Sequence, residues 1–171
     1  TLDLGGFTLT VLGDLDAGQT ITNGVVNAAG GGMIQGDVDD LLITADYTVS
    51  GPLNVAGDLT TNQDFIVSDQ TTTVTGSLLL EGAGARVIMA AAGGVLDVAG
   101  NATFDGASHS GWLTQGTLEV GGNFTVTTRS AFGFVGSVNH TVVLDGTAAA
   151  SVDFGVPGAG THRFNNLTFQ N

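Results

Sequence analysis

The sequence predicts an all-β protein, a right-handed parallel β-helix of about seven or eight coils with three short strands in each coil. Two observations carry this prediction. A short pattern of alternating apolar residues that ends in glycine recurs roughly every 22 residues along the chain. The composition is also rich in aliphatic residues and glycine and poor in charge, which suits a chain that turns often around an aliphatic core.

The recurring pattern is an apolar residue, any residue, a second apolar residue, any residue and then glycine, as in Leu118, Val120 and Gly122. Alternation of this kind indicates a half-buried strand, and glycine permits a tight turn at the end of the strand. Successive copies end 18 to 25 residues apart, and one degenerate copy ends at Gly36. The marking glycines are Gly13, Gly36, Gly57, Gly82, Gly100, Gly122 and Gly146. We expect these glycines to lie above one another at one corner of the stacked coils.

A short polar residue follows the glycine in five of the seven copies. These residues are Asp14, Asp37, Asp58, Asn101 and Asn123. Asp and Asn side chains readily hydrogen-bond to nearby backbone, so each pair predicts a corner between two strands. If the coils stack, these side chains are expected to form a hydrogen-bonded ladder along the corner.

The remaining apolar runs complete each coil, in chain order. Phe7 to Val11 alternates after the Gly5-Gly6 turn, and the residue after each polar corner position is usually apolar, as at Leu15, Leu59 and Phe124. Four further clusters predict a third side of the coil: 41–43, 65–67, 87–89 and 132–135. Near the end of the chain, Leu167 and Phe169 repeat the pattern with Asn171 in the glycine position. A β-sandwich is the main alternative, although it does not require a glycine corner in register.

Charge and composition exclude several classes of partner. The net charge is −13, from 16 carboxylates against three arginines, so we expect neither nucleic-acid binding nor attraction to anionic membranes. The absence of cysteine excludes disulfides and thiolate metal sites. No apolar run is long enough to span a membrane, and the chain opens on Thr1 without a basic and apolar leader. We interpret residues 1–171 as a single domain cut from a longer repeat protein.

Three stretches resemble the β-helical repeat regions of large secreted bacterial surface proteins, namely filamentous haemagglutinin-like exoproteins and autotransporter passengers. They are 118–126, 141–146 and 164–171, and the resemblance covers most of the chain. It implies an extracellular location at the bacterial surface and a role as a stalk or adhesive surface. It implies no active site, since these motifs describe coil geometry.

The candidates for chemistry are few. Asp37, Asp39 and Asp40 could hold a structural calcium ion through oxygen, although their spacing is not that of a calcium loop and a solvated turn is the simpler interpretation. Trp112, beside Gly111, could be a sugar-stacking platform, against the alternative of a loop folded over the core. No catalytic residue and no other cofactor is predicted.

Basic and histidine residues are not expected to converge. Arg86, Arg129 and Arg163 lie at different distances from their corner glycines, and so do the three histidines. A zinc site and a Ser108–His109 nucleophile and base pair are therefore improbable. The histidines are His109, His140 and His162.

Two hypotheses for function remain open. The first is a non-enzymatic extracellular segment that acts as a rigid spacer or adhesive surface, in contact with neighbouring repeats of its own polypeptide. Further partners would be other copies, through end-to-end or edge contacts, and host or matrix glycans and proteins. The alternative is a polysaccharide-binding or polysaccharide-cleaving β-helix, with the three aspartates and Trp112 as its first candidates.

Overall fold

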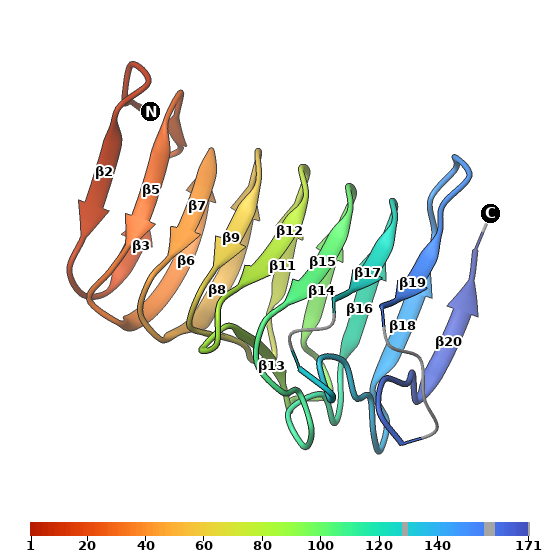
Figure 1. The fold of residues 1–171 in the computed structure, drawn as a ribbon. Helices are drawn as coiled ribbons and strands as arrows, with labels where there is room; N and C mark the ends of the chain where they lie inside the picture. The colour runs from red at the N-terminus through yellow and green to blue at the C-terminus, as the bar shows by residue number, and fades with distance from the viewer. Residues whose placement is uncertain (128–129, 156–159, 171) are drawn as a thin grey trace.

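The computed structural model describes residues 1–127, 130–155 and 160–170, and places them in a parallel β-solenoid of about seven turns. Its strands stack side by side from β2 near the N-terminus to β20 near the C-terminus (Figure 1). Every strand pairing is parallel, which confirms the predicted fold class and excludes the β-sandwich. Arg129 and Asn171 lie outside the described residues.

One side of the solenoid is an eight-stranded sheet. Its strands, in the order in which they stack, are β2 (Thr8–Val11), β5 (Val25–Ala28), β7 (Asp40–Ile43), β9 (Leu59–Thr61), β12 (Leu78–Glu81), β15 (Ala102–Asp105), β17 (Phe124–Val126) and β19 (Val152–Phe154). Each strand is paired in register with the corresponding strand one coil later. The cluster 41–43 is therefore β7 of this sheet, and not a third side as predicted.

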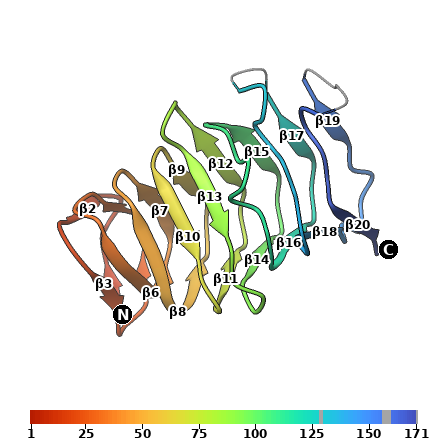
Figure 2. The same ribbon diagram turned by 90° about the horizontal axis from the view of Figure 1, so that it is seen from below.

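The other strands form a ten-stranded sheet and one small pair, seen from below in Figure 2. The larger sheet contains β3 (Leu15–Ala17), β6 (Gly32–Val38), β8 (Tyr47–Val55), β10 (Asp64–Val67), β11 (Thr71–Val74), β13 (Arg86–Met89), β14 (Val95–Val98), β16 (Thr117–Val120), β18 (Thr141–Leu144) and β20 (Asn166–Phe169). The small pair is β1 (Leu2–Asp3) with β4 (Ile21–Thr22). We call the part that contains β10 and β13 the third side.

The third side changes along the solenoid. The long strand β8 spans two sides, because its beginning pairs with β10 and its end pairs with β11. Separate third-side strands, β10 and β13, occur in the next two coils. After β13, the third side continues as single bridges, from Met89 to Leu113 and from Leu113 to Gly136. Three distinct strands per coil are therefore seen in the central coils, while loops replace the third strand toward the C-terminus.

A column of glycines forms one corner, as predicted, but its members differ from the predicted set. Gly76, Gly100 and Gly122 each donate their N–H to the carbonyl of the glycine one coil earlier, at 2.9 Å, starting from Gly57. Gly146 continues this corner, packed against Gly121.

Three predicted glycines lie elsewhere. Gly13 and Gly82 follow strands of the eight-stranded sheet, and Gly36 lies within β6 opposite Leu53. The error arose because both sheets have the same alternation of apolar residues, so Leu78, Leu80 and Gly82 match the pattern as well as the true corner does. The true copy ends at Gly76, and it was hidden because a fully buried threonine, Thr72, replaces its first apolar residue.

The core follows from the alternation along the strands. Inward residues of both sheets are buried, mostly Leu, Val and Ile, and toward the C-terminus aromatic rings join them. The rings of Phe124 and Phe134 pack edge to face with centroids 4.9 Å apart. Phe134 and Val135 are buried but Phe132 is 44% exposed, so only part of the cluster 132–135 reaches the interior. No helix with the length and apolar character needed to cross a membrane occurs in the described residues.

Candidate functional site

Polar side chains at the glycine corner bind the backbone of the next coil. Each side-chain oxygen accepts a hydrogen bond from the N–H of the residue above it in the same column. The bonds run from Asp58 N to Asp40 Oδ1 (2.8 Å), Ser77 N to Asp58 Oδ1 (2.7 Å), Asn101 N to Ser77 Oγ (3.2 Å), Asn123 N to Asn101 Oδ1 (2.8 Å) and Ser151 N to Asn123 Oδ1 (2.9 Å). The ladder thus links side chain to backbone across six levels, and it satisfies N–H groups that the turns leave unpaired.

Two of the predicted corner residues are not in this column. Asp14 accepts a hydrogen bond from Met33 N, and Asp37 accepts one from the Asn54 side chain. Besides the predicted Asp58, Asn101 and Asn123, the column contains Asp40, Ser77 and Ser151. None of the latter three residues follows a glycine of the predicted set, since Asp40 follows Asp39, Ser77 follows Gly76 and Ser151 follows Ala150.

The three aspartates proposed to bind calcium accept hydrogen bonds from three different residues. Asp37 Oδ1 is 2.6 Å from Asn54 Nδ2, Asp39 Oδ2 is 3.1 Å from Gly24 N, and Asp40 Oδ1 is 2.8 Å from Asp58 N. Within residues 1–127, 130–155 and 160–170, no three His, Asp or Glu side chains are grouped to hold a metal ion. The structure therefore does not bring Asp37, Asp39 and Asp40 together as one ligand set.

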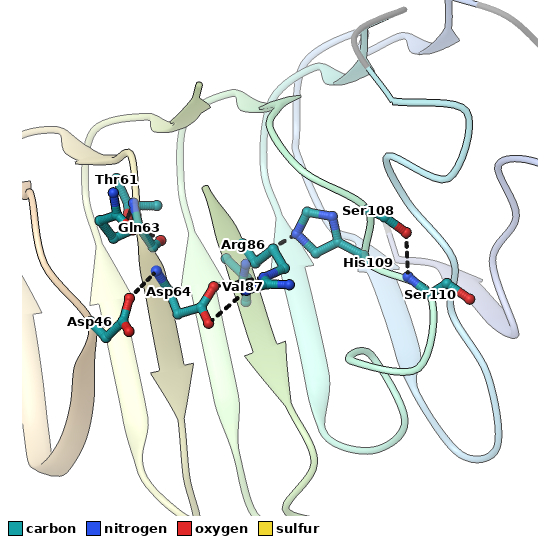
Figure 3. A network of polar contacts seen from close by, with 9 residues as sticks. All are labelled: Asp46, Thr61, Gln63, Asp64, Arg86, Val87, Ser108, His109 and Ser110. Atoms are coloured by element: carbon teal, nitrogen blue, oxygen red, sulfur yellow. Dashed lines mark hydrogen bonds and ion pairs between the residues drawn. The ribbon is translucent and has the colours of Figure 1, made fainter. Parts of the chain in front are cut away.

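An ion pair on the third side was not anticipated from the sequence (Figure 3). Arg86 donates from Nε to Asp64 Oδ1 at 2.7 Å and from Nη2 to Asp64 Oδ2 at 3.0 Å. Asp64 N in turn donates to Asp46 Oδ1 at 3.1 Å. The hydrogen bond to Asp64 raises the pKa of Arg86 above its ordinary value. The available signal was the separation of 22 residues between Asp64 and Arg86, which equals one coil.

Trp112 lies next to this ion pair. The guanidinium carbon of Arg86 is 5.1 Å from the centroid of the indole ring, a cation–π contact. The backbone of Trp112 is held on both sides, because its carbonyl accepts from Met89 N and its N–H donates to His109 O. The side chain remains 41% exposed. Trp112 is therefore partly exposed and not buried in the core.

The histidines are core residues. His109 Nε2 accepts a hydrogen bond from Val87 N at 3.0 Å, and His162 Nδ1 accepts one from Phe134 N at 3.4 Å. In both cases the imidazole nitrogen takes the place of the carbonyl that a neighbouring strand would supply. Burial lowers the pKa of His109 and of His140 to about 4. In Figure 3 the His109 ring points to Val87, away from Ser108, whose oxygen accepts from Ser110 N. This geometry provides no nucleophile and base pair at Ser108 and His109.

Three carboxylates share the outer face of the ten-stranded sheet. Asp97 and Glu119 are in register on β14 and β16, and Asp145 directly follows β18. Burial, and after it the charge of neighbouring carboxylates, raises the pKa of Asp97 and that of Glu119. This column is a site of like-charge repulsion.

Comparison of the chain with protein-family models, with curated proteins and with solved structures finds no match. A function for this chain is therefore inferred from its own sequence and geometry. The feature with exposed binding groups held in fixed positions is the third side around Trp112, Arg86 and Asp64.

Proposed function

We propose that this chain is a non-enzymatic structural and adhesive segment, a rigid β-solenoid spacer in a secreted or cell-surface bacterial protein. The observation that carries the proposal is the corner ladder, in which side chains of one coil bind the backbone of the next. A ladder of this kind resists bending and separation of the coils, because each coil is joined to its neighbour by the strand pairing and by an additional side-chain bond.

The extracellular location and the relation to filamentous haemagglutinin-like or autotransporter proteins belong to this proposal. They are supported by the repeat sequence together with the solenoid fold. In this setting the outward side chains would face host or matrix molecules, while the ends of the segment would meet neighbouring repeats.

The cleaving form of the polysaccharide hypothesis receives less support. Cleavage of a glycosidic bond needs a general acid and a base or nucleophile that face one substrate. The acidic groups near Trp112 are instead bound to protein partners: Asp64 to Arg86, and Asp46 to the backbone of Asp64. We expect no new reducing ends when the chain is incubated with pectin, alginate or neutral glucans, and sustained turnover of any of these would overturn the non-enzymatic proposal.

The spacer proposal is tested by a distance measurement. Thr10 and Thr125 lie in one outward column of the eight-stranded sheet, six coil steps apart. At roughly 4.8 Å per step their backbones are about 29 Å apart. Because the chain has no cysteine, spin labels can be placed specifically through Thr10→Cys and Thr125→Cys. We expect a single narrow distance distribution at low and high salt; a broad or multiple distribution would contradict a rigid spacer.

A further inference from the structure

We infer that Trp112, with the adjacent Arg86–Asp64 ion pair, is a binding platform for a neutral pyranose unit of a glycan. The inference rests on the adhesive part of the proposed function and names the chemical class of its ligand. The spacer part is independent of it.

The indole ring of Trp112 is exposed and held in place. Trp112 is the only tryptophan in the chain, and it is 41% exposed on the side of the solenoid, away from the two ends. Its backbone is fixed by hydrogen bonds to Met89 and His109, and its ring by the guanidinium of Arg86. A ring held in this way loses little conformational entropy on binding. Its negative π surface attracts the positive C–H groups on the face of a sugar ring, as it attracts the positive edge of another aromatic ring.

The Arg86–Asp64 ion pair supplies polar groups beside the ring. Arg86 has five N–H donors in a fixed fork, and two of them point to Asp64, so other donors remain. The carboxylate oxygens of Asp64 add acceptors. Sugar hydroxyls need both donors and acceptors at the edge of a stacked ring. The ion pair keeps the Arg86 donors in position without a ligand.

Charge and size select the ligand class. The net charge of −13 and the nearby Asp46 and Asp64 disfavour uronate-rich or sulfated glycans, so a neutral sugar is expected. A stable protein interface buries about 800 Å² on each partner, far more than one half-exposed indole presents. One to a few sugar rings are the better fit.

Trp112 also lies beside an apolar residue, so the test must separate a loss of sugar binding from a loss of packing. The bridge between Met89 and Leu113 places Trp112 beside Ile88, which is 8% exposed. Replacement of Trp112 by alanine therefore uncovers Ile88 as well as removing the platform. Trp112→Phe keeps cover over Ile88 with a smaller π surface, and Phe132→Ala removes another partly exposed aromatic side chain from the following coil.

The experiment is calorimetric titration of the 171-residue chain with cellohexaose, chitohexaose and a galacturonate oligomer of equal length. Emission from the single tryptophan reports on the same site in the wild type. We expect saturable binding of at least one neutral oligomer, at least tenfold weaker binding of the galacturonate oligomer, and a change in Trp112 emission that follows the heat. Trp112→Ala should weaken the Kd at least tenfold, Trp112→Phe should weaken it less, and Phe132→Ala should leave it unchanged.

Three outcomes would overturn the platform. They are no saturable binding of either neutral oligomer, a Trp112→Ala variant that binds as the wild type does, and an equal loss with Phe132→Ala. Thermal melting identifies a folding defect, and if Trp112→Ala does not fold, a Trp112→Phe variant with unchanged affinity overturns the platform instead. If Trp112→Ala protein on beads still adheres to glycan-coated surfaces as the wild type does, the platform is wrong while the adhesive function stands. The spin-label distance tests the spacer separately.

Discussion

At the scale of single residues, close approach of the backbone explains the glycine corner better than unusual dihedral angles do. A Cβ on Gly100 would lie 2.8 Å from both the Gly76 carbonyl carbon and Ser77 Oγ, nearer than real Cβ contacts. The carbonyl belongs to the backbone of the preceding coil, and that coil cannot move without breaking its own pairing. The distance between coils therefore leaves room only for glycine at position 100.

We predict that Gly100→Ala lowers the free energy of unfolding by about 1–3 kcal/mol, the usual cost of inserting an extra carbon into a packed site. Gly18→Ala is the matched control, because a Cβ at Gly18 meets no atom within 4 Å. Urea denaturation of the two variants measures the difference. Equal stability of Gly100→Ala and Gly18→Ala would contradict the close packing of this corner.

The buried histidines make stability depend on pH. The folded-state pKa of His109 and that of His140 are lowered to about 4, whereas an unfolded chain has the ordinary value of 6.5. Between pH 6.5 and pH 4 the unfolded state therefore binds protons that the folded state does not. The two histidines contribute nothing to this effect above pH 6.5, and they destabilise the fold progressively as pH falls, by up to roughly 3 kcal/mol each.

His140 is the better residue for measuring this effect, because neither of its ring nitrogens has a hydrogen-bond partner among the described residues and its substitution removes no such bond. We predict that His140→Leu loses less stability than the wild type between pH 7 and pH 4.5, in urea titrations at each pH. The carboxylates titrate in both proteins, so the difference between the two curves reports on the histidine. Parallel curves would show that His140 is not buried in its neutral form.

At the scale of the strands, the alternation that predicts a strand must be distinguished from the identity of the strand that pairs with it. Alternation predicted which residues face inward, and Leu118, Val120 and Phe124 are buried as expected. It could not predict which sheet a strand joins, because inward and outward residues alternate identically in both sheets. It also could not predict the inward histidines, since loops of different length change the register between coils. The Asp64–Arg86 pair has the separation of one coil, but neither residue belongs to the alternating pattern that ends in glycine. Local spacing therefore predicts strands well and contacts between coils poorly.

The carboxylates of β14 and β16 give a prediction at this scale. Burial and the charges of Asp97 and Asp145 raise the pKa of Glu119, so its ionised form costs stability at neutral pH. Glu119→Gln should stabilise the fold at pH 7 by no more than about 0.5 kcal/mol, which is measured as a small rise in melting temperature. This gain should shrink as pH falls, because Glu119 of the wild type then becomes protonated. Asp16→Asn, an exposed change on β3, is the control. A lower melting temperature for Glu119→Gln would show that its carboxylate is stabilising.

At the scale of the whole molecule, the two ends and the long sides have different chemistry. The chain termini lie at opposite ends of the stack (Figure 1), and each end exposes large apolar side chains. Phe7 is 77% and Leu12 80% exposed at one end, and Phe169 is 69% exposed at the other. β2 and β20 are each paired on one edge only, so each end also presents free backbone donors and acceptors. Addition of another coil would satisfy both features.

These ends predict that the 171-residue chain associates with itself end to end, and that salt controls the association. Two copies with a net charge of −13 repel each other, and the Debye length falls from about 30 Å at 0.01 M salt to about 3 Å at 1 M. Higher salt should therefore strengthen contact between the apolar ends, which is seen as a rise in sedimentation coefficient. Phe169→Asp should remain monomeric across the same range, while Thr103→Asp, on β15 in the middle of the stack, should behave as the wild type does. Association that weakens with salt, or that persists unchanged in Phe169→Asp, would place the contact elsewhere than the apolar ends.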